Sequence, residues 1–180
     1  PLICAGGGAF SSGAQHMVAR LSEQTNIPVI STMMGLGVLP TDHPLFMGMV
    51  GVFGSQTANL ALQKADLLII IGARVGDRAM SNPKQLQYQA QTIHIDVEPA
   101  EIGKNLTTTI PVVGNAGVIL QQILDTNPYP NTADWLMELK QQRETELHSG
   151  GAQFDGYISP LLFMEELSGQ LDENAAVVVD

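Results

Sequence analysis

Four apolar stretches in this chain each end in a turn of small or acidic residues, and this repetition restricts the fold more than any single motif does. The stretches and their turns are Leu2–Ala5 before Gly6–Gly8, Pro28–Ser31 before Thr32 and Gly35–Gly37, Leu67–Ile71 before Gly72–Arg74, and Thr92–Ile95 before Asp96 and Pro99. In an open parallel sheet, ligands bind outside the carboxyl ends of the strands, where loops and helix N-termini present free N–H groups. The pattern therefore predicts that these turns form one nucleotide cleft.

Segments with helical spacing separate the predicted strands. Helices are expected over 12–25, 55–65 and 114–124, and a further strand over 109–113. The region 35–54 is rich in Gly, Met and Pro, which indicates a long connection with one short strand, and such connections are often functional. Strands that alternate with helical crossovers indicate an α/β fold: a doubly wound, mainly parallel, Rossmann-like sheet of about six strands flanked by helices.

Breaks in the sequence divide the chain into three segments. Residues 1–127 carry the alternation of strands and helices, which a proline-containing break ends. Residues 128–159 are expected to form a capping helix, over 132–147, and a glycine-containing linker. Residues 160–180 are expected to open another domain, with a helix over 161–171 and a strand over 176–179. Because the chain begins in one predicted strand and ends in another, we expect it to be a piece of a longer polypeptide.

Charge and composition exclude several classes of protein. The formal net charge of −10 repels a phosphate backbone, so no nucleic-acid partner is expected. No apolar run reaches the roughly 18–20 residues that cross a bilayer, so no membrane association is expected. Cys4 is the only cysteine, which precludes an intrachain disulfide and favours the reducing cytoplasm. The histidines are scattered without the spacing of a metal site, so no metal ligands are expected.

The polar candidate residues each allow two interpretations. Gly6–Gly8 begins the G-x-G phosphate motif, but Ser11 occupies the place of its third glycine, so the segment is either a phosphate loop or a tight strand-to-helix turn. Arg74 and Arg78, four residues apart after a strand, either face one ligand together or are solvated. Asp96 either accepts hydrogen bonds from a ribose or adenine, or caps the turn that follows it.

The methionines after the second predicted strand and a histidine inside the fourth one are further candidates. Met33 and Met34 either line a flat aromatic ring such as a flavin or fill the core, because flexible thioethers suit both places. His94 alternates with isoleucines inside a strand, so it is expected to pack there rather than to act as a base.

Three motifs together closely resemble the middle domain of acetolactate synthase, also called acetohydroxyacid synthase. They are Ser31–Gly37, Gly72–Arg78 and His94–Asn105, and their order and spacing agree with that family over residues 1 to 125. The resemblance implies the doubly wound fold of the middle domain of thiamine-diphosphate enzymes. It also implies that residues 160–180 begin the thiamine-diphosphate-binding C-terminal domain, and that an N-terminal domain precedes Pro1.

In that family the middle domain holds FAD in an extended pose, although the net reaction is not a redox one. Carried over by position, the resemblance assigns Gly6, Gly7 and Gly8 to the diphosphate, Thr32, Met33 and Met34 to the flavin, Gly72, Arg74 and Arg78 to the central stretch, and Asp96 and Val97 to the adenosine. Arg78 would also bind the carboxylate of the second 2-oxo acid. The chain departs from the family at Gly76, Phe53 and Asn115, where the family often has Asp, His and Asp, so the resemblance assigns no flavin contacts to these three residues.

The resemblance further implies a carboligase that decarboxylates pyruvate on thiamine diphosphate, with Mg²⁺, and joins the two-carbon unit to a second 2-oxo acid, giving precursors of branched-chain amino acids. The catalytic glutamate and the diphosphate–metal motif would lie outside this chain, which alone is expected to be inactive. A homo-oligomer, dimer or tetramer, and a regulatory small subunit are the expected protein partners.

Two alternatives within the wider thiamine-dependent group remain open at this point. The domain could belong to a pyruvate oxidase, in which FAD carries electrons, or to a flavin-free decarboxylase, in which it is a structural spacer. A nucleotide-binding protein unrelated to thiamine enzymes is a more distant alternative.

Overall fold

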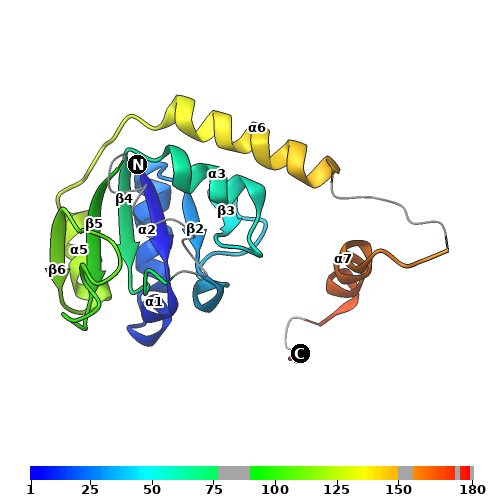
Figure 1. Cartoon of the computed structure of the whole chain (residues 1–180), viewed down its shortest axis with the longest axis horizontal. Helices are drawn as coiled ribbons and strands as arrows, with labels where there is room; N and C mark the ends of the chain where they lie inside the picture. Colours follow the sequence, from blue (N-terminus) through cyan, green and yellow to red (C-terminus); the bar gives the residue numbers. More distant parts are fainter. Residues whose placement is uncertain (77–89, 150–155, 173–174, 179–180) are drawn as a thin grey trace. The chain divides into compact units, whose positions relative to one another are not determined.

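The structure is a computed structural model that describes residues 1–76, 90–149, 156–172 and 175–178. Its main element is a six-stranded sheet. The strands are β1 (Leu2–Ala5), β2 (Val29–Ser31), β3 (Phe46–Met49), β4 (Leu67–Ile71), β5 (Gln91–Asp96) and β6 (Ile110–Val113). They lie in the order β3-β2-β1-β4-β5-β6, and every neighbouring pair is parallel (Figure 1). The prediction of a doubly wound parallel sheet is confirmed.

The sheet is wound outward from its middle in two directions. The chain runs from β1 to β2 and β3 on one side, and then returns to place β4, β5 and β6 on the other. The strand order therefore reverses between β1 and β4. At such a switch point the connections leave toward opposite faces, and a crevice opens at the carboxyl ends of the two strands.

Helices bury both faces of the sheet. On one face lie α1 (Gly7–Ser11), α2 (Gln15–Thr25) and α5 (Ala116–Asp125), and on the other lie α3 (Gln56–Lys64) and the first part of α6 (Ala133–Ser149). Successive side chains of β4 divide between the two cores, with Ile70 in one and Ile69 and Ile71 in the other. Strands buried on both faces need apolar residues at successive positions, which explains the continuous apolar run of β4.

α6 lies where the sequence predicts a capping helix, and its first part, up to Arg143, lies at the amino ends of the strands (Figure 1). The Trp135 indole N–H donates to the Pro1 carbonyl at 3.0 Å. Arg143 donates to the carbonyls of Thr41 at 2.7 Å and His43 at 3.1 Å. These contacts leave the opposite edge, where the glycine turns lie, free of this helix.

The structure corrects two predicted elements. The helix expected over 12–25 begins only at Gln15, as α2, because the chain turns at 12–14, where Gly13 has a φ of +66° that favours glycine. The short helix α1 before this turn is not predicted from the sequence. The strand expected over 176–179 is not formed by residues 175–178, and no other strand pairs with this segment in the described part of the chain. A strand needs such a partner for its backbone hydrogen bonds.

The structure divides into two units, Pro1–Arg143 and Glu144–Asp180. The second unit contains α7 (Pro160–Gln170), which begins at an N-cap, Ser159, and exposes Leu162, Phe163 and Met164. No helix of the described residues combines the length and the apolar character that crossing a membrane requires.

Cys4 provides a test of the buried sheet. It lies in the middle of β1 with no exposed surface, and burial raises the pKa of its thiol to about 12. Because the thiolate is the reactive form, we expect a maleimide to label Cys4 at neutral pH only when the domain unfolds. Labelling followed against urea concentration should track the unfolding transition. Labelling of the native protein as fast as that of an unstructured cysteine peptide would contradict the burial.

Candidate nucleotide-binding site

A cavity of about 1370 Å³ opens at the carboxyl ends of the strands, beside the switch point. Its lining comes from four turns, those after β1, β2, β3 and β4. The lining residues are Gly7, Gly8, Phe10, Ser11, Thr32, Met33, Met34, Met49, Val50, Gly51, Val52, Phe53, Gly72, Ala73, Arg74 and Gly76. Seven of the residues predicted from sequence thus share one cavity: Gly7, Gly8, Thr32, Met33, Met34, Gly72 and Arg74.

The turn after β1 and the turn after β4 are joined by backbone hydrogen bonds. The Gly6 N–H donates to the Ile71 carbonyl at 2.9 Å, and the Gly8 N–H donates to the Gly72 carbonyl at 2.8 Å. The Gly72 N–H in turn donates to the Ile95 carbonyl of β5 at 2.8 Å. The carboxyl ends of three strands are thereby fixed relative to one another.

Close approach of the backbones explains the glycines at this junction. A Cβ atom on Gly8 would lie 2.6 Å from the Gly72 Cα, and a Cβ on Gly6 would overlap the Gly72 carbonyl. Gly72 also has a φ of +54°. Gly6 and Gly8 therefore fit the tight-turn interpretation. Gly7 lines the cavity as Gly8 does, but it differs from both neighbours because no atom lies within 3.0 Å of the place of its Cβ and its N–H has no acceptor among the described residues.

The two methionines after β2 are exposed. The short 3₁₀ helix η1 (Met33–Gly35) packs closely on the end of β1. The Thr32 N–H donates to the Ala5 carbonyl at 2.9 Å, and Gly35 leaves room for that carbonyl, which a Cβ at this position would overlap. Met33 and Met34 are 75% and 76% exposed and line the cavity, which excludes the core-filling interpretation for both.

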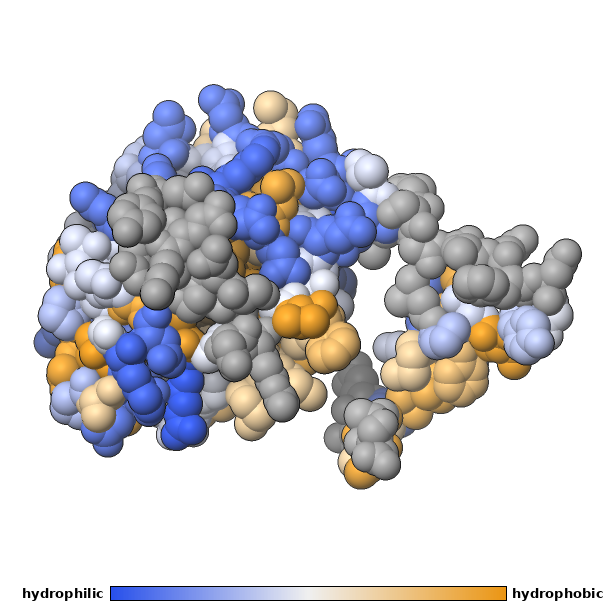
Figure 2. Space-filling model, viewed as in Figure 1, coloured by the Kyte–Doolittle hydropathy of each residue, from blue (hydrophilic) through white to orange (hydrophobic). Residues whose placement is uncertain are grey.

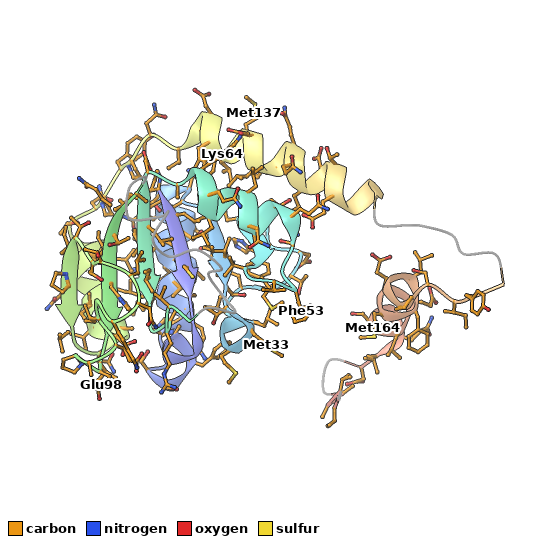
Figure 3. The ribbon with its side chains drawn as sticks, in the orientation of Figure 1. Met33, Phe53, Lys64, Glu98, Met137 and Met164 are labelled. Atoms are coloured by element: carbon orange, nitrogen blue, oxygen red, sulfur yellow. The ribbon has the colours of Figure 1, made fainter. Side chains whose placement is uncertain are left out.

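The turn after β3 completes an apolar mouth of the cavity, formed by Met33, Met34, Val52 and Phe53. Val52 is 66% exposed and Phe53 is 92% exposed. Figure 3 shows Met33 and Phe53 at the same edge of the sheet unit, and in Figure 2 apolar surface gathers in this region, below β3. The sequence alone does not assign Val52 to the site, and it marks Phe53 only as a departure from the family's His, although the long 35–54 connection was a signal for both.

Not every predicted residue lines the cavity. Gly6 is buried beneath it, and Val97, which is 74% exposed, lies outside it. Asp96 also lies outside the lining, and its carboxylate accepts the Glu98 N–H at 2.9 Å, which supports the capping interpretation for one of its oxygens. Arg74 is exposed and lines the cavity. Arg78 lies outside the described residues.

His94 is buried in β5, and neither ring nitrogen has a hydrogen-bond partner among the described residues. Burial lowers the pKa of His94, because desolvation disfavours the imidazolium, while the nearby Asp96 carboxylate, the Ala73 backbone and Glu101 partly oppose that shift. The residue is therefore neutral in the folded protein at pH 7. It packs inside the strand, as the sequence predicts.

The buried imidazole should make stability depend on pH. The unfolded chain takes up a proton below about pH 6.5, whereas the folded chain resists protonation at His94 because its pKa is lower there. The free energy of unfolding should consequently fall as the pH decreases below about 6.5, by at most about 1.4 kcal/mol per pH unit from this group. Urea titrations at several pH values should show a weaker dependence in His94→Phe. Equal dependence in both proteins would contradict this role.

The described residues contain no group of three or more His, Cys, Asp or Glu side chains that could hold a metal ion. Within the described part of the chain, the candidate site is a crevice of glycine turns with the cation of Arg74 and an apolar mouth.

Residues 1–123 match the family described as thiamine pyrophosphate enzyme, central domain. Among curated relatives, the chain is 48% identical to a probable acetolactate synthase large subunit of Methanocaldococcus jannaschii, over 69% of this chain and 21% of that protein. It is 36% identical to a probable acetolactate synthase large subunit of Methanococcus aeolicus, over 96% of this chain and 31% of that protein. It is 39% identical to the acetolactate synthase large subunit of Lactococcus lactis, over 80% of this chain and 25% of that protein. The chain therefore spans between a fifth and a third of the length of these relatives.

Proposed function

The chain belongs to the thiamine pyrophosphate enzyme family, and its residues 1–123 form the central domain of that family; we propose that it is part of an acetolactate synthase large subunit in which this domain holds FAD. The observation that carries the proposal is the continuity of the cavity, which joins the glycine turns at the switch point to the apolar mouth. Relatives that cover nearly the whole chain support the choice of enzyme.

The size and lining of the cavity suit a dinucleotide. Pockets for drug-sized ligands occupy roughly 300–1,000 Å³, and this one has about 1370 Å³. Gly7 would meet the diphosphate, because its N–H has no acceptor in the described part of the chain and it has no side chain to fill the space. Arg74 supplies the cation that a diphosphate favours. The thioethers of Met33 and Met34 would lie against the flavin ring.

The adenosine would extend past the cavity toward the end of β5. The Gly72 N–H bonds to the Ile95 carbonyl, so the β4 turn lies directly beside Asp96 and Val97. One carboxylate oxygen of Asp96 is used by Glu98, and the other is available for a ribose hydroxyl. Gly6, Gly8, Gly72 and Thr32 would act by shaping the crevice.

The proposed reaction needs groups that this chain does not supply. FAD would have a structural role here, because joining a two-carbon unit from pyruvate to a second 2-oxo acid involves no net redox change. Thiamine diphosphate and Mg²⁺ would bind to other parts of the longer protein, and residues 160–180 would begin its C-terminal thiamine-binding domain. We also propose a cytoplasmic homo-oligomer with a regulatory small subunit, and Arg78 as the group that binds the acceptor carboxylate.

Calorimetric titration of the chain with FAD and with ADP tests the site. Both ligands should bind, and ADP should compete with FAD, because the diphosphate contacts come from one sheet. Gly7→Val should abolish the binding of both, since its Cβ would lie 3.2 Å from the Met34 Cβ and its methyl groups would project into the cavity. Gly169→Val in α7 is a matched control, because a Cβ there meets nothing within 4 Å.

If neither ligand binds the wild-type chain at millimolar concentration, the domain is a spacer and the flavin-free alternative is correct. If a folded Gly7→Val chain binds both ligands as well as the wild type does, the diphosphate does not bind at this turn.

Arg78 can be tested in the longer protein. Arg78→Ala should impair transfer to the second 2-oxo acid more than decarboxylation of the first, because a charge-assisted contact of roughly 1.5–3 kcal/mol is lost from one step only. Separate assays of carbon dioxide release and of acetolactate formation provide the comparison. Equal losses in both assays would exclude a role specific to the acceptor.

A further inference from the structure

The turn after β3 presents large apolar side chains to solvent although its backbone is held in place. Val52 and Phe53, at its tip, are largely exposed and line the cavity (Figure 3). The Gly54 N–H donates to the Gly51 carbonyl at 3.0 Å, and the Ser55 N–H donates to the Met49 carbonyl at 2.9 Å. Gly51 has a φ of +123°, which few other residues adopt. The tip is therefore exposed because its backbone directs it outward.

One side chain of the neighbouring helix α3 holds the base of this turn. The Asn59 Oδ1 accepts the Gly51 N–H at 3.1 Å, and the Asn59 Nδ2 donates to the Gly51 carbonyl at 2.9 Å and to the Ser55 carbonyl at 3.1 Å. Asn59 thus pairs with both backbone groups of the glycine that begins the turn. It is half-buried and does not line the cavity.

A turn fixed in this way lowers the entropic cost of binding, because the ligand does not need to order it. A flat ring inserted at the mouth would cover Phe53 and the two methionines together. An aromatic side chain on a fixed backbone stacks on such a ring in a defined orientation.

We propose that Asn59 is a positioning residue, which holds the 50–54 turn so that Phe53 stacks on the flat ring of the bound flavin. This inference rests on the proposed FAD site and adds to it a residue that acts without touching the ligand. It predicts selectivity: Asn59 should matter for ligands that carry the ring and not for those that lack it.

The experiment compares the affinities of FAD and ADP, measured by calorimetry on the 180-residue chain, in a double-mutant cycle. Phe53→Ala should lower the ratio of FAD affinity to ADP affinity by about tenfold, within the range of aromatic stacking. Asn59→Ala should lower the ratio in the same direction. Because Asn59 acts through Phe53, adding Asn59→Ala to Phe53→Ala should change the ratio by less than about twofold. Phe53→Tyr, which keeps the ring, should preserve the wild-type ratio.

Ser22→Ala is the control for lost stability, because the Ser22 hydroxyl donates to the Ile27 carbonyl at 2.7 Å near the other end of β2. It should leave the ratio unchanged. If Asn59→Ala does not fold, Asn59→Asp replaces it, since that variant keeps the acceptor for Gly51 but loses both donated bonds.

The outcomes separate this inference from the proposed function. If the wild type binds FAD but Asn59→Ala weakens FAD and ADP equally, or if the two substitutions are additive, Asn59 has only a structural role and the inference is wrong. If the wild type binds neither ligand, the proposed FAD site is wrong and this inference with it.

Discussion

The contact between two glycine backbones at the middle of the sheet determines where everything else in the candidate site can lie. Gly8 and Gly72 approach so closely that neither position has room for a Cβ, and a hydrogen bond of 2.8 Å joins them. This contact draws the turn after β1 against the turn after β4 at the point where the strand order reverses. The crevice follows from that geometry, because the connections diverge on either side of it.

The site combines this crevice with an apolar mouth that a different part of the chain supplies. The turns after β1 and β4 present the Gly7 N–H, which has no acceptor among the residues that the structure describes, and the cation of Arg74, and both groups suit a diphosphate. The mouth comes from η1 and from the turn after β3, which Asn59 holds. Polar and apolar contacts are thus provided by separate rigid turns, and a ligand with a charged centre and a flat apolar end matches both.

The sequence predicts the fold well because the central strands β1, β2 and β4 are short, mainly apolar runs that end at small residues, and β5 ends at an acid before a proline turn. It also predicts which turns meet, since carboxyl ends of parallel strands share one edge. It does not distinguish Gly7 from Gly6 and Gly8, because that difference depends on the distance to Gly72 across the sheet. It marks Phe53 only as a departure from the family's His. It misses Asn59, whose proposed role arises from a contact between its side chain and the backbone of Gly51, eight residues away. The turn at Gly13 and the short helix α1 before it are not predicted, because the helical spacing of apolar residues begins only at Ala14.

A crystal structure of the chain grown with FAD tests the central claim most directly, because it locates the ligand. The account predicts electron density for the diphosphate beside Gly7 and Arg74, for the flavin ring between Met33, Met34 and Phe53, and for the adenosine toward Asp96. A dinucleotide bound away from the switch point, or reversed so that the adenine occupies the apolar mouth, would contradict it.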